Sequence, residues 1–287
     1  MFFVQIIILA VLQGACELLP VSSSAHVIIA EKLMGIDPTT PEMTLMLVML
    51  HTGTMFAVII FFWRSWRIDY FQSGETTMKF IRLVFVATLL TFVIGFVLKV
   101  LIERVFMSHV ADAEVEMIFG NLGLISLSLA AAGIFIIRSG WRDVRPAENI
   151  EVGLRGSVWI GAVQALCLPF RGFSRSGATI STGLLLSISK KAVEEFSFAL
   201  VVIITPPVIL KEVYRLFKSR HSSSPQASMD LFHMFLPSLI GMAASFLAGL
   251  LALEWLSSWL EKGRWRYFGY YCLAVSAFAF FLYLKGF

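Results

Sequence analysis

Six long runs of apolar residues limit the folds that this chain can adopt. A transmembrane helix needs about 20 mostly apolar residues, because the hydrocarbon core of a bilayer is about 30 Å thick. The chain has 287 residues, of which 58% are hydrophobic and only 15% are charged. Soluble domains carry about 25% charged residues. We therefore expect an all-α polytopic membrane protein with about six full transmembrane helices. The expected spans are residues 43–63, 79–102, 115–137, 193–210, 231–253 and 267–284.

Four further apolar runs are too short to cross a bilayer. They form two pairs, and each pair flanks a cluster of polar residues. Short or interrupted apolar segments at matching places in two halves of a membrane protein indicate an internal repeat with a site between the halves. The pairs therefore predict two re-entrant helical hairpins whose polar tips meet. The short runs are residues 1–16 and 18–30 in the first half, and 156–170 and 176–189 in the second.

The two halves align weakly with each other. Sliding one along the other places Gln13 on Gln164 and Ser23 on Ser174. Three expected spans separate the hairpins, and an odd number of crossings puts the second hairpin on the opposite membrane face. We therefore expect an inverted repeat inside a single integral membrane domain. The repeats cover approximately residues 1–102 and 156–253 of the domain, which takes in residues 1–287.

The distribution of basic residues predicts the orientation. Lys and Arg are more frequent in the loops on one side of the expected spans, and such loops face the cytoplasm. Both termini are then expected to face outward, although the basic loop 211–230 lies on the other side. The small net charge of +4 fits loops beside anionic headgroups, not a nucleic-acid surface. Membrane lipids are the expected partners, nucleic acids are not, and the sequence leaves a homodimer open.

The first polar cluster begins on the first apolar run. Gln13 and Glu17 are four residues apart and therefore share a helix face. Ionisable groups inside a membrane are costly, so they mark a functional site by default. The Glu17 carboxylate can serve as a metal ligand or as a base.

The same cluster continues into a second helix. Pro20 favours a break followed by a new helix, and Ser22–Ser24 then lie at a helix start with unpaired backbone N–H groups. Such a start binds anions, above all phosphate. His26 follows one turn later, within reach of a serine nucleophile such as Ser23. The alternative for the serines is that they bond back to helix carbonyls or pack as small residues.

The second polar cluster centres on Arg175. Its guanidinium is a planar, permanently charged fork that suits a phosphate. The alternative is a structural ion pair of Arg175 with Glu17 or Glu195. Arg171 is near enough in sequence to be a second phosphate ligand, but it can equally point to the membrane interface.

Hydroxyl and imidazole groups complete the candidate set. Ser174, Ser176 and Thr179 offer hydroxyls beside Arg175, while His51 lies in the middle of an expected span. We consider these four residues, with Gln13, Ser22, Ser24 and Arg171, as substrate-binding candidates.

The quoted residues resemble the two signatures of a known family, the undecaprenyl pyrophosphate phosphatases of the bacitracin-resistance type. The resemblance implies a multi-pass enzyme of the bacterial cytoplasmic (inner) membrane. Such an enzyme removes the terminal phosphate of undecaprenyl diphosphate and so recycles the lipid carrier of cell-wall precursors. The resemblance also implies a site that faces the outer side. The segments that carry it are Gln13-xxx-Glu17, Leu19–His26, Leu50–Thr54, Gly172–Thr179 and Glu195–Phe198.

The resemblance implies a role for each matching residue. The serine–histidine segment falls on Ser23 and His26, the acidic motif on Gln13 and Glu17, and the phosphate-binding arginine on Arg175. Ser23, His26, Glu17 and Arg175 are therefore the expected catalytic residues. Glu17 is also expected to hold a divalent cation, Mg²⁺ or Ca²⁺, with help from diphosphate oxygens.

Two departures from the family pattern raise the hypothesis of a divergent paralogue. The first acidic position is Gln13, which the family pattern tolerates but which leaves one fewer carboxylate for a cation. In the second signature the usual Pro-Gly is replaced by Phe170-Arg171-Gly172, with Pro169 displaced. The shape of this loop is expected to differ.

Two other function classes compete with hydrolysis. A transporter or flippase of lipid-linked phosphate uses the same inverted repeat with broken helices, but it has little need for a nucleophile beside a histidine. A phosphohistidine phosphatase needs a second histidine where this chain has Thr179.

Overall fold

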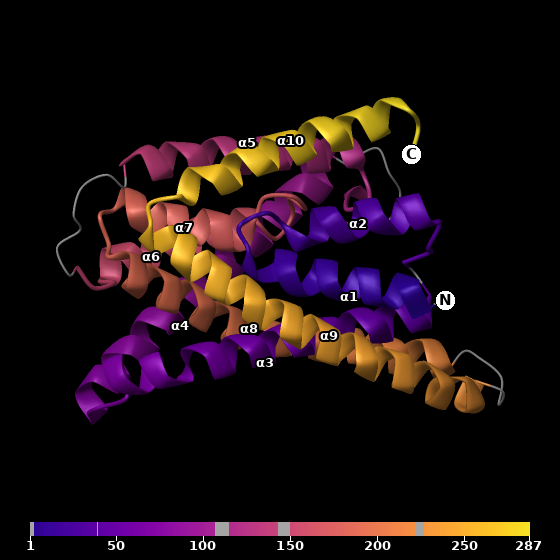
Figure 1. Cartoon of the computed structure of the whole chain (residues 1–287), viewed down its shortest axis with the longest axis horizontal. Coiled ribbons are helices and arrows are strands. Elements are labelled where there is room, and N and C mark those ends of the chain that lie inside the picture. Colours follow the sequence, from indigo (N-terminus) through magenta and orange to yellow (C-terminus); the bar gives the residue numbers. More distant parts are fainter. Residues whose placement is uncertain (1–2, 39, 107–114, 143–149, 222–226) are drawn as a thin grey trace.

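The computed structural model describes residues 3–38, 40–106, 115–142, 150–221 and 227–287, and every regular element in these ranges is helical (Figure 1). A π-helical turn (Ile102–Phe106) and a 3-10 turn (Val115–Ile118) lie between α4 and α5. The α-helices are α1 (Phe3–Leu18), α2 (Ser23–Met34), α3 (Pro41–Asp69), α4 (Gly74–Leu101), α5 (Leu122–Arg142), α6 (Leu154–Leu166), α7 (Arg175–Leu185), α8 (Lys190–His221), α9 (Ala227–Glu261) and α10 (Trp265–Leu284).

Six of these helices are long and apolar enough to cross a membrane. The prediction of an all-α polytopic protein with about six long apolar helices is therefore confirmed. Several of the helices extend beyond the predicted runs, because polar residues at their ends continue the helix. The candidate spans are Met43–Asp69, Gly74–Val105, Leu122–Trp141, Lys190–Tyr214, Phe235–Glu261 and Trp265–Leu284.

The four remaining α-helices are short and form two pairs. Figure 1 shows α1 and α2 together in one half of the molecule, and α6 and α7 in the other half. The turns of the two pairs meet, because Ser176 at the start of α7 donates a hydrogen bond of 3.1 Å to the carbonyl oxygen of Leu19 in the α1–α2 turn. The start of α1 and the end of α10 lie at the same end of the molecule.

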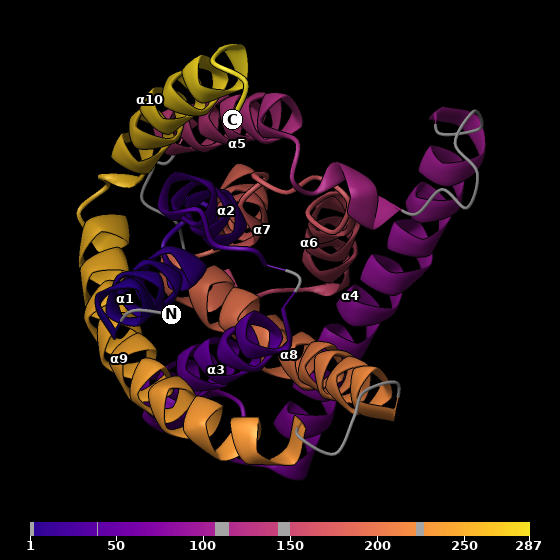
Figure 2. The same ribbon diagram turned by 90° about the vertical axis from the view of Figure 1, so that its right-hand side faces the viewer.

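Close helix contacts hold the short pairs in place. Along α9, a Cβ atom at Gly14 of α1 would lie 2.4 Å from the carbonyl oxygen of Ser245, and one at Gly53 of α3 would lie 2.4 Å from that of Met242. Small residues let backbones approach in this way, which is the main source of packing energy between membrane helices. Figure 2 shows that α9 and α10 run along the outside of the molecule, with α1, α2 and α7 inside them.

Candidate active site

A cavity of about 220 Å³ lies where the turns of the two short helix pairs meet. Its walls come from α1, α2, α3, α6, α7, α8 and the loop between α6 and α7. The polar part of the wall includes Glu17, Ser23, His51, Arg171 and Arg175, and the apolar part includes Leu168, Ile204 and Val208. The cavity therefore joins both polar clusters of the sequence.

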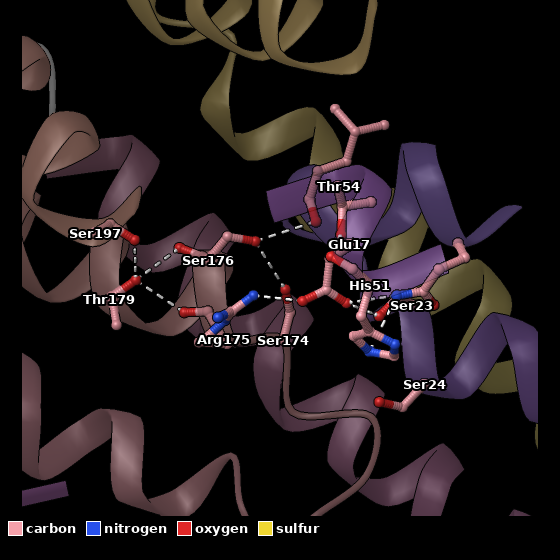
Figure 3. Close-up of polar contacts among 12 residues, drawn as sticks. Glu17, Ser23, Ser24, His51, Thr54, Ser174, Arg175, Ser176, Thr179 and Ser197 are labelled. Atoms are coloured by element: carbon pink, nitrogen blue, oxygen red, sulfur yellow. Dashed lines mark hydrogen bonds and ion pairs between the residues drawn. The ribbon is translucent and has the colours of Figure 1, made fainter. Parts of the chain in front are cut away.

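Glu17 is the centre of the polar wall, and its carboxylate accepts three hydrogen bonds (Figure 3). Arg175 donates from Nη2 to Oε1 at 2.5 Å, which is also an ion pair. Ser23 donates from Oγ to Oε2 at 2.5 Å, and Gln13 donates from Nε2 to Oε2 at 3.1 Å. Of the two ion-pair partners considered for Arg175, the structure selects Glu17. Glu195 instead accepts a hydrogen bond from Ser65 of α3.

His51 approaches the same carboxylate through Gln13. The His51 Nδ1 atom lies 2.8 Å from the carbonyl oxygen of Leu47, so Nδ1 carries the hydrogen and donates it. Nε2 then accepts from the Gln13 amide at 3.2 Å. The expectation that this mid-helix histidine lies at the site matches its position in the cavity wall.

The starts of α2 and α7 converge on the cavity. Ser22 caps α2, with its side chain accepting from the Ala25 N–H, and Ser174 caps α7, with its side chain accepting from the Gly177 N–H. Ser22 has φ of 68°, in a region that non-glycine residues rarely occupy. Both helix starts present unpaired N–H groups, which favour a bound anion. The sequence predicted only the first of these two starts.

The hydroxyls of Ser176 and Thr179 form hydrogen bonds to other groups of the protein. Ser176 donates to Leu19 of the α1–α2 turn, and Thr179 lies 2.6 Å from Ser197 of α8 and donates to the Arg175 carbonyl at 2.9 Å. Thr179 is fully buried and is not among the residues that line the cavity. The structure thus places Thr179 behind Arg175, where it orients α7 against α8.

Within the described residues, the side chains of His26 and Ser23 form no hydrogen bond with each other and have other partners. The His26 Nδ1 donates to the carbonyl oxygen of Ser22 at 2.8 Å, and Nε2 accepts from the Tyr271 hydroxyl at 2.8 Å. The two rings also stack, with centroids 5.6 Å apart. Ser23 is oriented by Glu17 instead, because the α2 start turns its hydroxyl toward α1. In this structure His26 thus supports the Ser22 carbonyl.

Tyr271 is a residue of the site region that the sequence did not predict. It lies in α10, 245 residues after His26, within a helix rich in aromatic residues. Such residues are common on lipid-facing helices, so the sequence carries no signal for this contact.

Arg171 lies at the edge of the cavity. Its guanidinium donates to the Ser24 hydroxyl at 3.2 Å and lies 4.3 Å above the ring of Phe119. A guanidinium over an aromatic face is held by a cation–π interaction. Of the two orientations considered for Arg171, the structure shows the one toward the cavity.

The side chains of the cavity do not form a ready-made site for a divalent cation. Among the described residues that line the cavity, Glu17 alone is a carboxylate, and its oxygens already accept three hydrogen bonds. No three His, Cys, Asp or Glu side chains gather anywhere in the described ranges. Mg²⁺ and Ca²⁺ require about six or more oxygen ligands. The side chains around Glu17 therefore do not fit the expected cation as a permanently bound ion.

Comparisons with known proteins show what this sequence is similar to. The sequence matches the family model described as "Bacitracin resistance protein BacA" over residues 6–278. It is 55% identical over 276 residues to undecaprenyl-diphosphatase 2 of Acinetobacter baylyi, with 96% of each chain covered. It is 29% identical to the undecaprenyl-diphosphatase of Bdellovibrio bacteriovorus, with 100% of this chain and 98% of the relative covered. It is 30% identical to that of Bacteroides fragilis, with 94% of each chain covered.

These matches include both polar signatures, and the structure brings the two signatures together at Glu17 and Arg175. Because one family model and full-length relatives cover nearly the whole sequence, the chain belongs to the family of the bacitracin resistance protein BacA.

Proposed function

We propose that this protein hydrolyses undecaprenyl diphosphate to undecaprenyl phosphate and inorganic phosphate, and so recycles the lipid carrier of the bacterial cell wall. The observation that carries the proposal is the contact of Ser23 and Arg175 with the same carboxylate, Glu17, inside one cavity. The relatives named undecaprenyl-diphosphatase support the same substrate.

The diphosphate binds at the converging starts of α2 and α7. Arg175 offers a planar fork of N–H donors that suits two phosphate oxygens, and it leaves the Glu17 carboxylate as the phosphate arrives. The helix N-termini add backbone N–H groups and a favourable dipole. The polyprenyl chain leaves the cavity along the apolar wall that includes Leu168, Ile204 and Val208.

Hydrolysis transfers the terminal phosphoryl group to an oxygen nucleophile, either Ser23 Oγ or a water beside it. A bond forms from this oxygen to the terminal phosphorus, and the bond from phosphorus to the bridging oxygen breaks. Undecaprenyl phosphate leaves with the bridging oxygen, and the nucleophile's proton passes to Glu17, which lies 2.5 Å from Ser23 Oγ. In the serine route, water then cleaves the phosphoserine. Arg175 stabilises the charge on the transferring group.

The architecture that suits this reaction is an inverted repeat. The proposal assigns α1–α2 and α6–α7 to two re-entrant hairpins, in repeats of about residues 1–102 and 156–253 within one integral membrane domain. It places the site toward the outer side of the bacterial inner membrane, as the resemblance to the family implies. Support comes from the odd number of long helices, three, between the two short pairs. Cross-linking in membranes would test whether the protein assembles as a homodimer.

Phosphate release from purified protein in detergent tests the proposal. The substrate is undecaprenyl diphosphate, with and without a chelator, and Arg175→Ala is the inactive control. Release of one phosphate per lipid, lost in the control, is the expected result. Transfer of the lipid between leaflets of proteoliposomes without phosphate release would instead support the flippase alternative.

A further inference from the structure

Glu31 is a buried carboxylate that the reaction described above does not use. It lies in the last turn of α2, and only 4% of its surface is exposed. Its Oε1 atom accepts no hydrogen bond from any residue in the described ranges, and Glu31 is not among the residues that line the cavity. A buried carboxylate with an unbonded oxygen is costly unless an opposite charge lies nearby.

Arg171 supplies that charge. Burial raises the pKa of Glu31 to about 7, and the positive charge of Arg171 acts in the other direction, in favour of the ionised carboxylate. Glu31 follows Ser24 by seven residues, about two helical turns, so both side chains lie on one face of α2. Helical side chains lean toward the helix N-terminus. The carboxylate therefore leans toward the turn at which Arg171 donates to Ser24.

Three groups orient the long side chain of Arg171 toward α2. They are the Ser24 hydroxyl at 3.2 Å, the ring of Phe119 at 4.3 Å and the charge of Glu31. The hydroxyl and the ring are neutral, so among these three groups the carboxylate is the one that attracts the full positive charge. Because a guanidinium has five N–H donors in a fixed fork, one edge can face α2 while another edge remains available at the cavity.

Both arginines of the second polar cluster thus face an acid of the α1–α2 pair. Arg175 contacts Glu17 in the cavity wall, and Arg171 faces Glu31 at the cavity edge. In the proposed reaction Arg175 binds the terminal phosphate, which is transferred. The arginine at the edge is then placed for the other phosphate of the diphosphate, the one attached to the lipid.

We propose that Glu31 is a positioning residue that holds the Arg171 guanidinium toward the cavity, and that Arg171 there binds the phosphate that stays on the lipid. This inference rests on the proposed diphosphate substrate. Because Glu31 acts through Arg171 and does not line the cavity, removing its charge weakens binding of the lipid diphosphate and leaves the chemical step unchanged.

Glu31→Gln tests the inference, since it keeps the shape of the side chain and removes the charge. Steady-state kinetics in detergent are expected to show KM raised about fivefold, with kcat within about twofold of the native value. The melting temperature is not expected to fall, because the variant removes a buried charge. An unchanged KM together with a lower melting temperature would show that Glu31 only supports the fold, and the inference would be lost.

The double variant with Arg171→Ala shows whether Glu31 acts through Arg171. Once Arg171 is absent, Glu31→Gln is expected to change KM by less than about twofold, because residues that act through each other are not additive. The same fivefold rise in the Arg171→Ala protein would overturn the proposed coupling.

Glu151→Gln is the charge-matched control. Glu151 pairs with Lys79 at 2.9 Å, is exposed and is not among the residues that line the cavity. This variant is expected to keep the native KM. A rise equal to that of Glu31→Gln would show that the overall charge of the protein is responsible, and the role of Glu31 would be lost.

Inhibition by inorganic phosphate shows which phosphate Arg171 binds. Inorganic phosphate is the transferred group after hydrolysis, so it occupies the Arg175 end of the site. Its inhibition constant is expected to change by less than about twofold in Glu31→Gln, because that end keeps all its contacts. A rise as large as the rise in KM would place Arg171 at the transferred phosphate and overturn the assignment.

Binding of a lipid analogue separates this inference from the proposed function. The probe is a polyprenyl methylenediphosphonate, which cannot be hydrolysed, and its affinity is measured by titration calorimetry in detergent. Weaker binding to Glu31→Gln by about fivefold, with no hydrolysis of undecaprenyl diphosphate by the native protein, would support the inference and overturn the function. Hydrolysis by the native protein, with equal affinity of both proteins for the analogue, would do the reverse.

Discussion

Glu17 of α1 and Arg175 of α7 are 158 residues apart in the sequence, yet their side chains form an ion pair of 2.5 Å. Only 14% of the Glu17 side chain and 19% of the Arg175 side chain are exposed. Because desolvation offsets much of the attraction in such a pair, it is weak evidence for a purely stabilising role. Its position in the cavity wall suits an exchange in which a diphosphate replaces Glu17 as the partner of Arg175.

The first prediction concerns Arg175. Arg175→Ala should lower phosphate release by about 10³-fold or more, because the developing charge loses its main donor. Arg175→Lys should restore only part of the activity, since an ammonium is a point charge without the planar fork. Arg175→Ala should also lower the melting temperature, because a buried carboxylate left without its partner costs about 3 kcal/mol or more. Equal activity of the Lys and Arg proteins would contradict the fork argument.

Arg171 should matter less than Arg175. It lies at the cavity edge, exposed, with Ser24 and Phe119 as its contacts. Arg171→Ala should lower kcat/KM by about tenfold, mainly through KM, because a partly solvated contact contributes about 1–2 kcal/mol to binding. Steady-state kinetics over a range of lipid concentrations checks this. A loss as large as that of Arg175→Ala would show that Arg171 contacts the transferring phosphate.

Ser23 and Glu17 should behave as one unit. Their 2.5 Å contact positions the hydroxyl, so Ser23→Ala and Glu17→Gln are each expected to lose most activity. The double variant should be little worse than either single variant, because groups that act together are strongly non-additive. Quenching the reaction of a radiolabelled diphosphate then separates the routes, since labelled protein is expected only if Ser23 attacks phosphorus. Additive losses would argue that the two side chains act independently.

The sequence could predict features that depend on residues close together in the chain. It could not predict contacts that depend on how distant segments pack. The shared face of Gln13 and Glu17 follows from a helix period of 3.6 residues, and the six apolar helices follow from their length. The preference of Ser23 for Glu17 over His26 was not predictable, because it depends on how the α1–α2 turn aims each side chain. The Tyr271 hydroxyl reaches His26 from α10, and only the packing of α10 against the rest of the fold determines such a contact.

His26 and Tyr271 are expected to act through position rather than through proton transfer. His26→Ala should lose most activity and also lower the melting temperature, because the ring holds the carbonyl of Ser22, whose φ is 68°. Tyr271→Phe removes one hydrogen bond to the same ring and should reduce activity only about two- to tenfold, with a smaller shift in melting temperature. A Tyr271→Phe protein with unchanged stability but abolished turnover would point to a direct role of this pair in proton transfer.

The last prediction concerns the loop that departs from the family pattern. Gly172 has φ of 110°, which residues with a Cβ rarely adopt, and a Cβ there would lie 2.7 Å from the carbonyl oxygen of Ile125 in α5. Gly172→Ala should therefore destabilise the protein by about 1–3 kcal/mol and displace the loop that carries Arg171 and leads to Arg175. Gly153→Ala is the matched control, because that φ is −97° and no described atom lies within 4 Å of the added Cβ.

Melting temperature in detergent and phosphate release are measured together on both glycine variants. Gly172→Ala is expected to lower both, and Gly153→Ala neither. The activity loss should exceed what the unfolded fraction explains, because a displacement of Arg175 by about 1 Å is enough to impair phosphate positioning. A Gly172→Ala protein with native melting temperature and native turnover would show that the loop reaches the same shape without glycine.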